Sequence, residues 1–160
     1  MGVVTKTGDD GKSRWNNQVV DKDSALLEAV GTLDELMSVL GVIIERGRER
    51  EEYVLVGVNR VLYRISGELT GYEKVDREKI EMAVLEIEGE IETIEKRKGN
   101  IKGFLEAGRQ LDANLNLART VCRRAERRLV SLNKVSPIDQ NILKYINRLS
   151  DYLFVEARKE

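Results

Sequence analysis

The stretch ARTVCRRAERR holds five arginines and one glutamate, which makes it the part of the chain best suited to bind an anion. At 100° per residue of an α-helix, Arg119, Arg123 and Arg127 fall on one stripe, with Glu126 beside it. Arginine stays charged and donates two parallel hydrogen bonds from a planar fork, which suits a polyphosphate. The stripe is therefore either a solvated, salt-bridged helix flank or a socket for a phosphate-rich anion.

Two further sets of polar residues have helical spacing. Arg124 and Arg128 lie on the other flank of the same helix, across its apolar face. In NRLSDYLF, Asn147 and Asp151 are four residues apart and share one side of a second helix, opposite its apolar residues. Taken alone, each set also fits ordinary exposed polar residues.

The stretch EAVGTLDELMSVLG places a carboxylate among small residues. Asp34 shares one helix side with Gly31, Ser38 and Gly41. Small residues let another helix approach closely, and a carboxylate beneath that helix is costly unless it is paired. We therefore expect Asp34 to pair with Arg119 of the basic helix; the alternative is an exposed Asp34.

The N-terminal stretch TKTGDDGKS combines glycines, hydroxyls and lysines. Gly8 and Gly11 free backbone N–H groups that can surround phosphate oxygens, and Lys6 and Lys12 add positive charge. The spacing differs from that of a Walker A motif. The stretch is either a phosphate-binding loop or a flexible terminus.

Helices must position these residues, because periodicity of helical type continues from Ser24 onward. Ser24 is expected to cap the first helix. No strand-like alternation of useful length is present. We predict one domain, 1–160, with a loop at 1–23 and an all-α, up-and-down five-helix bundle at 24–160. The expected helices are 24–46, 51–72, 76–98, 110–133 and 138–158.

Composition excludes several classes of protein. With 27 basic and 28 acidic side chains, the chain has no general attraction for nucleic acid or an anionic membrane. It has no histidine and one cysteine, which excludes histidine general-base catalysis and an internal disulfide, and argues against a Cys/His metal site. The most apolar window is interrupted by carboxylates, so we expect a cytoplasmic protein without a membrane span or secretion signal.

Taken together, five stretches resemble one family in order and spacing. TKTGDDG, KD at Lys22, EAVGTLDEL, ARTVCRRAER and NRLSDYLFVEAR look like those of the ATP:corrinoid adenosyltransferases of the helical-bundle type. The resemblance implies that a Co(I) corrinoid attacks the 5′ carbon of ATP, forms the cobalt–carbon bond of adenosylcobalamin and expels triphosphate. No proton need be moved by the protein. Such a step needs cations on the leaving group and a fixed geometry, and Mg²⁺ usually bridges the phosphates.

The resemblance also implies a role for each site residue. Asp34 and Arg119 match an ion pair that is both structural and catalytic, and Arg123 is also expected to act in catalysis. Asp151 matches a residue near the corrinoid, and Phe104 resembles an aromatic that presses on the lower face of cobalt. The ATP-binding residues would be Thr5, Lys6, Thr7, Gly8, Ser13, Lys22, Arg123, Arg124, Glu126, Arg127 and Asn147.

The family is typically a homotrimer with sites between subunits, so the loop at 1–23 is expected to close over the basic helix of an adjacent chain. This sequence departs from the family pattern in FLEAGRQ, which lacks the usual proline, and at Asn116, where histidine is common. These departures keep a second hypothesis open, an ATP-binding regulator without corrinoid turnover. A third, an RNA-binding bundle, is opposed by the balanced charge and by the lack of aromatic residues among the arginines.

Overall fold

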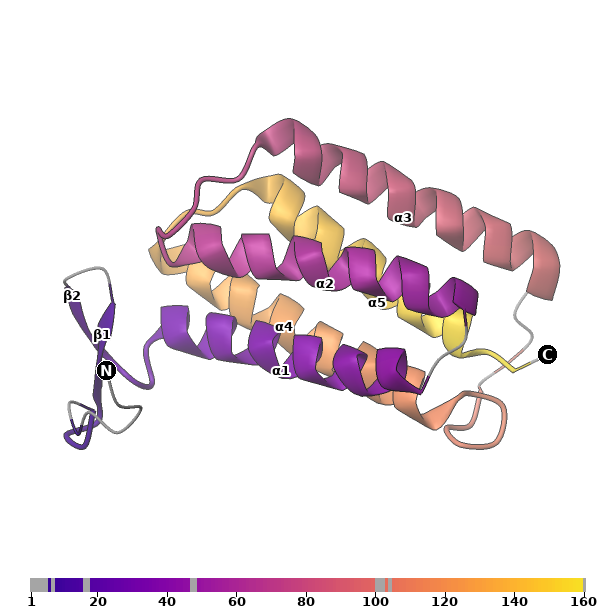
Figure 1. Ribbon diagram of the computed structural model, residues 1–160, viewed down its shortest axis with the longest axis horizontal. Helices are drawn as coiled ribbons and strands as arrows, with labels where there is room; N and C mark the ends of the chain where they lie inside the picture. Colours follow the sequence, from indigo (N-terminus) through magenta and orange to yellow (C-terminus); the bar gives the residue numbers. More distant parts are fainter. Residues whose placement is uncertain are drawn as a thin grey trace.

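The computed structural model describes residues 6, 8–15, 18–46, 49–99, 103 and 105–159. In these residues five helices follow a small hairpin, as Figure 1 shows, which confirms the predicted all-α bundle. The elements are β1 Lys12–Trp15, β2 Gln18–Asp21, α1 Ala25–Glu45, α2 Glu49–Leu69, α3 Arg77–Lys98, α4 Ala113–Val135 and α5 Gln140–Ala157.

Side-chain caps determine where four of these helices begin. Ser24 caps α1, as predicted, with its hydroxyl oxygen accepting from the backbone N–H of Leu27 at 3.4 Å. Aspartates cap the other three: Asp76 before α3, Asp112 before α4 and Asp139 before α5. The largest difference from the expected starts is at α4, because the Asp112 carboxylate accepts two N–H bonds there and Ala113 becomes the first helical residue.

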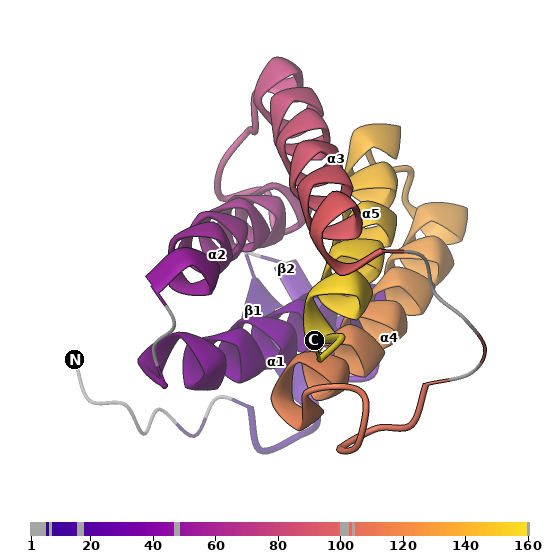
Figure 2. The ribbon, with the colours of Figure 1, turned by 90° about the vertical axis from the view of Figure 1, so that its right-hand side faces the viewer.

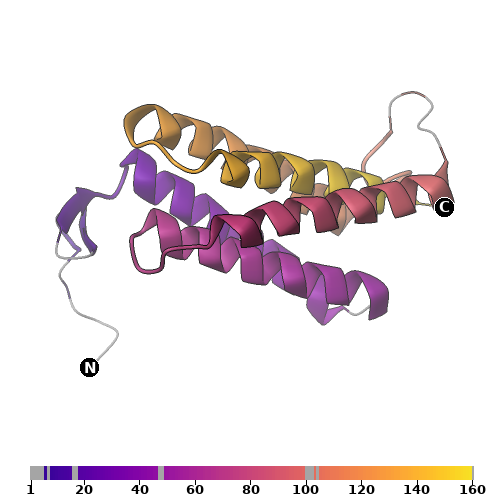
Figure 3. The same cartoon turned by 90° about the horizontal axis from the view of Figure 1, so that it is seen from above.

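The helices form a bundle in which neighbours along the chain run in opposite directions (Figure 1). Helix α1 packs against α2 and α4, and α5 packs against α4 and α3, so α1, α4 and α5 make up the centre. Figures 2 and 3 show this order from the end of the bundle and from above. In the described segments, no helix combines the length and the apolar character that a membrane crossing requires.

Apolar stripes of the central helices face one another and form the core. Fully buried leucines and isoleucines come from each of them. Because these stripes meet inside the bundle, the opposite polar faces of α4 and α5 are turned outward. The residues concerned are Leu33, Leu36 and Leu40 of α1, Leu129 of α4, and Ile146 and Leu149 of α5.

The expectation that the N-terminal region has no strands was wrong. β1 and β2 pair antiparallel, with Lys12 opposite Asp21 and Trp15 opposite Gln18. Each strand has only four residues, too few for an alternating pattern to stand out, although the two asparagines between them favour a turn. The hairpin projects beyond the N-terminal end of α1, outside the bundle (Figures 1 and 3).

Candidate functional site

The predicted arginine stripe lies on the outer face of α4. Arg123 and Arg127 are exposed, and one N–H of the Arg127 guanidinium donates to the backbone carbonyl of Arg123 at 3.0 Å. Arg119 is half-buried: its Nε donates to Oδ1 of Asn116 at 2.9 Å, and its guanidinium carbon lies 5.8 Å from the ring centroid of Phe154. Among the residues that the structure describes, none forms an ion pair with Arg123. The Arg123 guanidinium is therefore available to an anion from outside.

The other two arginines of the helix hold α4 against α1. Arg124 pairs with Glu35, and Nε of Arg128 lies 3.1 Å from a carboxylate oxygen of Glu28. Both pairs are on the flank away from the stripe. The structure therefore does not bring Arg124 to the other predicted ATP residues of this chain, and gives it a partner on α1 instead.

The expected pairing of Asp34 with Arg119 was wrong for a single chain. Asp34 is exposed, and a Cβ placed on Gly31 or Gly41 would have no neighbour within 4 Å, so within the described part of the chain no helix covers that face. The ion pairs between α1 and α4 explain why. They place Glu35 beside Arg124, and Arg119 lies five residues before Arg124 on α4, a rise of roughly 7 Å along the helix axis.

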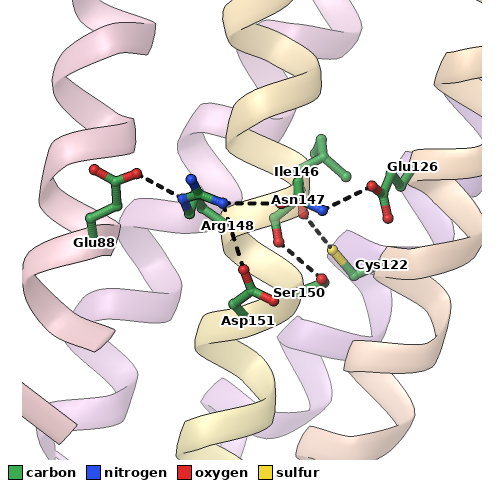
Figure 4. Close-up of polar contacts among 8 residues, drawn as sticks. All are labelled: Glu88, Cys122, Glu126, Ile146, Asn147, Arg148, Ser150 and Asp151. Carbon is green, nitrogen blue, oxygen red and sulfur yellow. Dashed lines mark hydrogen bonds and ion pairs between the residues drawn. The ribbon is translucent and has the colours of Figure 1, made fainter. Parts of the chain in front are cut away.

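Helix α5 supplies the second half of the site. The Asn147 amide nitrogen donates to Oε1 of Glu126 on α4 at 3.0 Å, so two predicted ATP-binding residues are in direct contact (Figure 4). The adjoining Cys122 is buried and donates its thiol to the Ile146 carbonyl at 3.4 Å. Burial raises the pKa of this thiol, so Cys122 stays neutral and serves packing.

Asp151 lies one turn beyond Asn147 on α5, and nearby charged side chains change its pKa. Desolvation by burial raises its pKa above the ordinary value, Arg148 and Arg123 lower it, and Glu126 raises it. The charges of Arg123 and Glu126 on α4 are therefore close enough to Asp151 to change its pKa, while its carboxylate lies 3.8 Å from a terminal nitrogen of Arg148. Helix α5 thus carries Asp151 one turn from Asn147, which itself contacts Glu126 of the arginine helix.

The raised pKa of Asp151 predicts a pH-dependent effect of Asp151→Asn on stability. The folded chain holds this proton more tightly than the unfolded chain, so the contribution of Asp151 to stability falls as pH rises through the raised pKa. At pH 7 the asparagine variant should be more stable, by less than about 1 kcal/mol because water screens this half-exposed side chain. Thermal unfolding at pH 7 and pH 3.5 checks this. The compared quantity is the stability of the asparagine variant minus that of the parent. The prediction is contradicted if this difference is smaller at pH 7 than at pH 3.5.

The N-terminal residues form a separate group in the single chain. Nζ of Lys22 donates to the Gly8 carbonyl at 2.6 Å, which ties Gly8 to the end of the hairpin. Lys6 is exposed with a φ of 58°, and Ser13 lies on β1. None of the bonds found among described residues joins this group to α4 or α5. Three predicted residues, Thr5, Thr7 and Phe104, lie outside the described residues.

Sequence reasoning missed a pair of residues next to the site. Arg148 of α5 donates through Nε to Oε1 of Glu88 on α3 at 2.7 Å and through a terminal nitrogen to Oδ1 of Asn147 at 3.1 Å (Figure 4). Arg148 could have been identified from the sequence, because it directly follows Asn147 and precedes Asp151 by three residues. Glu88 carried none, because nothing in its local sequence indicates that α3 lies beside α5.

Comparison with known proteins gives a consistent result. The family model described as cobalamin adenosyltransferase matches residues 3–160. A corrinoid adenosyltransferase of Bacillus subtilis is 36% identical over 99% of this chain and 86% of its own length. The corrinoid adenosyltransferase MMAB of Mus musculus is 36% identical over 98% of this chain and 71% of its own length.

Solved structures agree. A variant PduO-type ATP:corrinoid adenosyltransferase from Lactobacillus reuteri, complexed with cobalamin and ATP, matches with a TM-score of 0.85 at 29% identity, over 98% of this chain and 92% of that one. A second variant of that type, complexed with ATP, matches with a TM-score of 0.87 at 30% identity over the same shares. The chain therefore belongs to the cobalamin adenosyltransferase family, as a helical-bundle enzyme that transfers an adenosyl group from ATP to a corrinoid.

Proposed function

We propose that this chain makes adenosylcobalamin in a site shared between two copies of itself. One copy contributes the outer face of α4 and α5, with Arg123, Glu126, Asn147 and Asp151. The other contributes its N-terminal segment. This proposal is supported by a separation: Arg123 is exposed on α4, while the β1–β2 hairpin projects beyond the N-terminal end of α1, away from its own bundle (Figure 1).

In the proposed reaction, the Co(I) centre of the reduced corrinoid substrate attacks C5′ of ATP with its electron pair. The cobalt–carbon bond forms as the bond from C5′ to the triphosphate oxygen breaks, and that electron pair leaves with the triphosphate. Arg123 and Arg127 would neutralise charge on the leaving triphosphate, where such charge stabilisation has its largest effect on rate. Lys6 and Lys22 of the adjacent copy would do the same from the other side, with Thr5, Thr7, Gly8 and Ser13 lining the phosphates.

The corrinoid is proposed to lie toward Asp151 and the segment that contains Phe104. An aromatic ring on the lower face of cobalt would exclude a lower axial ligand, which makes Co(II) easier to reduce to the Co(I) nucleophile. Arg119, packed on Phe154 near this end of the site, would connect the corrinoid region to the arginine stripe.

Mg²⁺ fits the proposed site as an ion held mainly by substrate. In the described part of the chain, no three Asp, Glu or Cys side chains form a ready metal site. Glu126 is the carboxylate beside the arginine stripe and offers the hard oxygen ligand that Mg²⁺ prefers. When bound, the ion would offset phosphate charge, while Glu126 is held in place by the Asn147 amide.

Assembly as a homotrimer is part of the proposal, and it gives Asp34 a partner. The exposed face of α1 that carries Gly31, Asp34 and Gly41 has room for a helix of a second copy. We propose that Asp34 pairs there with Arg119 of the neighbouring chain. We also propose that the chain works in the cytoplasm as one domain.

This intersubunit pair predicts a charge-reversal rescue. Asp34→Arg places two cations together, so it should weaken assembly and lower activity at least about tenfold, because like charges at an interface cost several kcal/mol. Adding Arg119→Asp should restore part of both. Light scattering after size-exclusion chromatography measures the assembly. An Asp34→Arg variant that remains trimeric and fully active rules out the pair.

The function itself is tested by mixing the protein with ATP, Mg²⁺ and chemically reduced cobalamin. The expected result is the spectrum of adenosylcobalamin together with one triphosphate released per product. Reactions without ATP or without protein serve as controls. Binding of ATP without turnover would instead identify a regulatory homologue.

A further inference from the structure

Arg148 links three helices at the edge of the proposed site. Its Nε donates to Oε1 of Glu88 on α3 at 2.7 Å, and a terminal nitrogen donates to Oδ1 of Asn147 at 3.1 Å. The same nitrogen lies 3.8 Å from a carboxylate oxygen of Asp151. Through Asn147 the network continues to Glu126 on α4 (Figure 4).

The network fixes the orientation of the Asn147 amide. A guanidinium can only donate and an ionised carboxylate can only accept. Arg148 therefore binds the amide oxygen, and Glu126 accepts from the amide nitrogen at 3.0 Å. Both ends of the amide are occupied by groups of the correct type, so a 180° flip would put two donors together at one end and two acceptors at the other.

Arg148 also offsets the negative charge around Asp151. Glu88, Glu92 and Glu95 of α3 line the same groove as Asp151, and the charge of Glu126 on α4 also raises the pKa of Asp151. Arg148 and Arg123 are the cations that lower the pKa of Asp151. The side chains of Arg148 and Glu88 are exposed to similar extents, 37% and 33%, and Arg148 lines this groove together with Asp151.

We propose that Arg148 is a positioning residue of the adenosyltransferase site: anchored by Glu88, it holds Asn147 and Asp151 in place without touching either substrate. This inference rests on the proposed function, because it takes Asn147 as an ATP contact and Asp151 as a corrinoid contact. Arginine is required because its planar fork donates from Nε and from a terminal nitrogen at once, in fixed directions. A lysine carries the same charge on one nitrogen and cannot span both partners with that geometry.

The test is steady-state kinetics of Arg148→Lys in the full chain, with ATP and reduced cobalamin varied in turn. We expect kcat/KM for each substrate to fall by roughly ten- to a hundredfold, since small displacements of positioning groups have effects of that size. The Tm should stay within about 3 °C, because half-exposed ion pairs add little stability. Arg77→Lys is the matched control: Arg77 Nε also bridges α3 to a carboxylate at α5, Asp139 at 3.0 Å, away from the site.

Double variants separate positioning from a general structural effect. If Arg148 acts through Asn147, adding Arg148→Lys to Asn147→Ala should change kcat/KM for ATP by less than about twofold, because two residues that act as one unit are not additive. Glu88→Ala should likewise have little further effect in the Arg148→Lys background. Full additivity in both cycles, or an Arg148→Lys variant with parent kinetics, overturns the proposal.

Two single variants, Asn147→Ala and Asp151→Asn, distinguish failure of the positioning role of Arg148 from failure of the site assignment. If Asn147→Ala and Asp151→Asn impair activity while Arg148→Lys does not, the site stands and only the positioning role is lost. If Asn147→Ala and Asp151→Asn both keep full activity, the site assignment itself is wrong and the role of Arg148 falls with it.

Discussion

Replacing Arg123 by alanine is expected to lower kcat by about 100- to 1000-fold, the loss that follows when one charge-stabilising donor is removed from a reaction site. Arg123 is exposed and forms no ion pair with a described residue, so its removal breaks no ion pair of the folded chain and takes away only the charge that lowers the pKa of Asp151. The variant should also lose the rise in Tm that ATP produces in the parent, because that rise depends on ATP affinity.

Arg128→Ala is the matched control for Arg123. It removes an arginine from the same helix, but one that points to Glu28 of α1 on the opposite flank. It should keep the ATP-dependent rise in Tm and lose at most about 1 kcal/mol of stability. An Arg123→Ala variant that is still stabilised by ATP to the same extent would show that the stripe does not grip the triphosphate.

The largest effect on stability is expected from Leu149→Ala. Leu149 is fully buried on α5, on the side opposite the polar network and between the helices that carry the site. Truncation removes apolar contact and leaves a cavity, at a cost of about 2–5 kcal/mol in the free energy of unfolding. For a chain of this size that corresponds to a Tm lower by about 5–15 °C.

Leu85→Ala controls for the general effect of shortening a leucine. Leu85 lies on α3 with 61% of its surface exposed, so its truncation should change stability by about 0.5 kcal/mol or less. Thermal unfolding followed by circular dichroism compares the two variants. Equal Tm values for both would mean that Leu149 does not belong to the core.

Local sequence determined the features that depend on helical geometry alone. The stripe of Arg119, Arg123 and Arg127 follows from a constant rotation per residue, and Ser24 was identified as a cap by its residue type and position. The separation of Arg124 and Arg128 from that stripe follows from the same rotation. Order and spacing of the motifs were also enough to indicate the family that the comparisons confirm.

Features that join distant segments could not be read in the same way. Asp34 was predicted to pair with Arg119 of the basic helix because small residues suggested a close helix, but local sequence does not determine the register between α1 and α4. That register is fixed by packing and by ion pairs such as Arg128 with Glu28. The hairpin was missed because its strands are stabilised by pairing with each other, not by a pattern within either one.

The sequence by itself determined which side chains share a helix face, where helices begin and which family the chain resembles, because these depend on residues close together along the chain. Only the tertiary structure decided that Glu126 meets Asn147, that Glu88 anchors Arg148, and that the glycine face beside Asp34 has no neighbour among the described residues. Those contacts depend on which helices become neighbours and how far each slides along the next. Helix neighbours and their register are determined by burial of the apolar surfaces of all the helices together. No single stretch of sequence therefore specifies them.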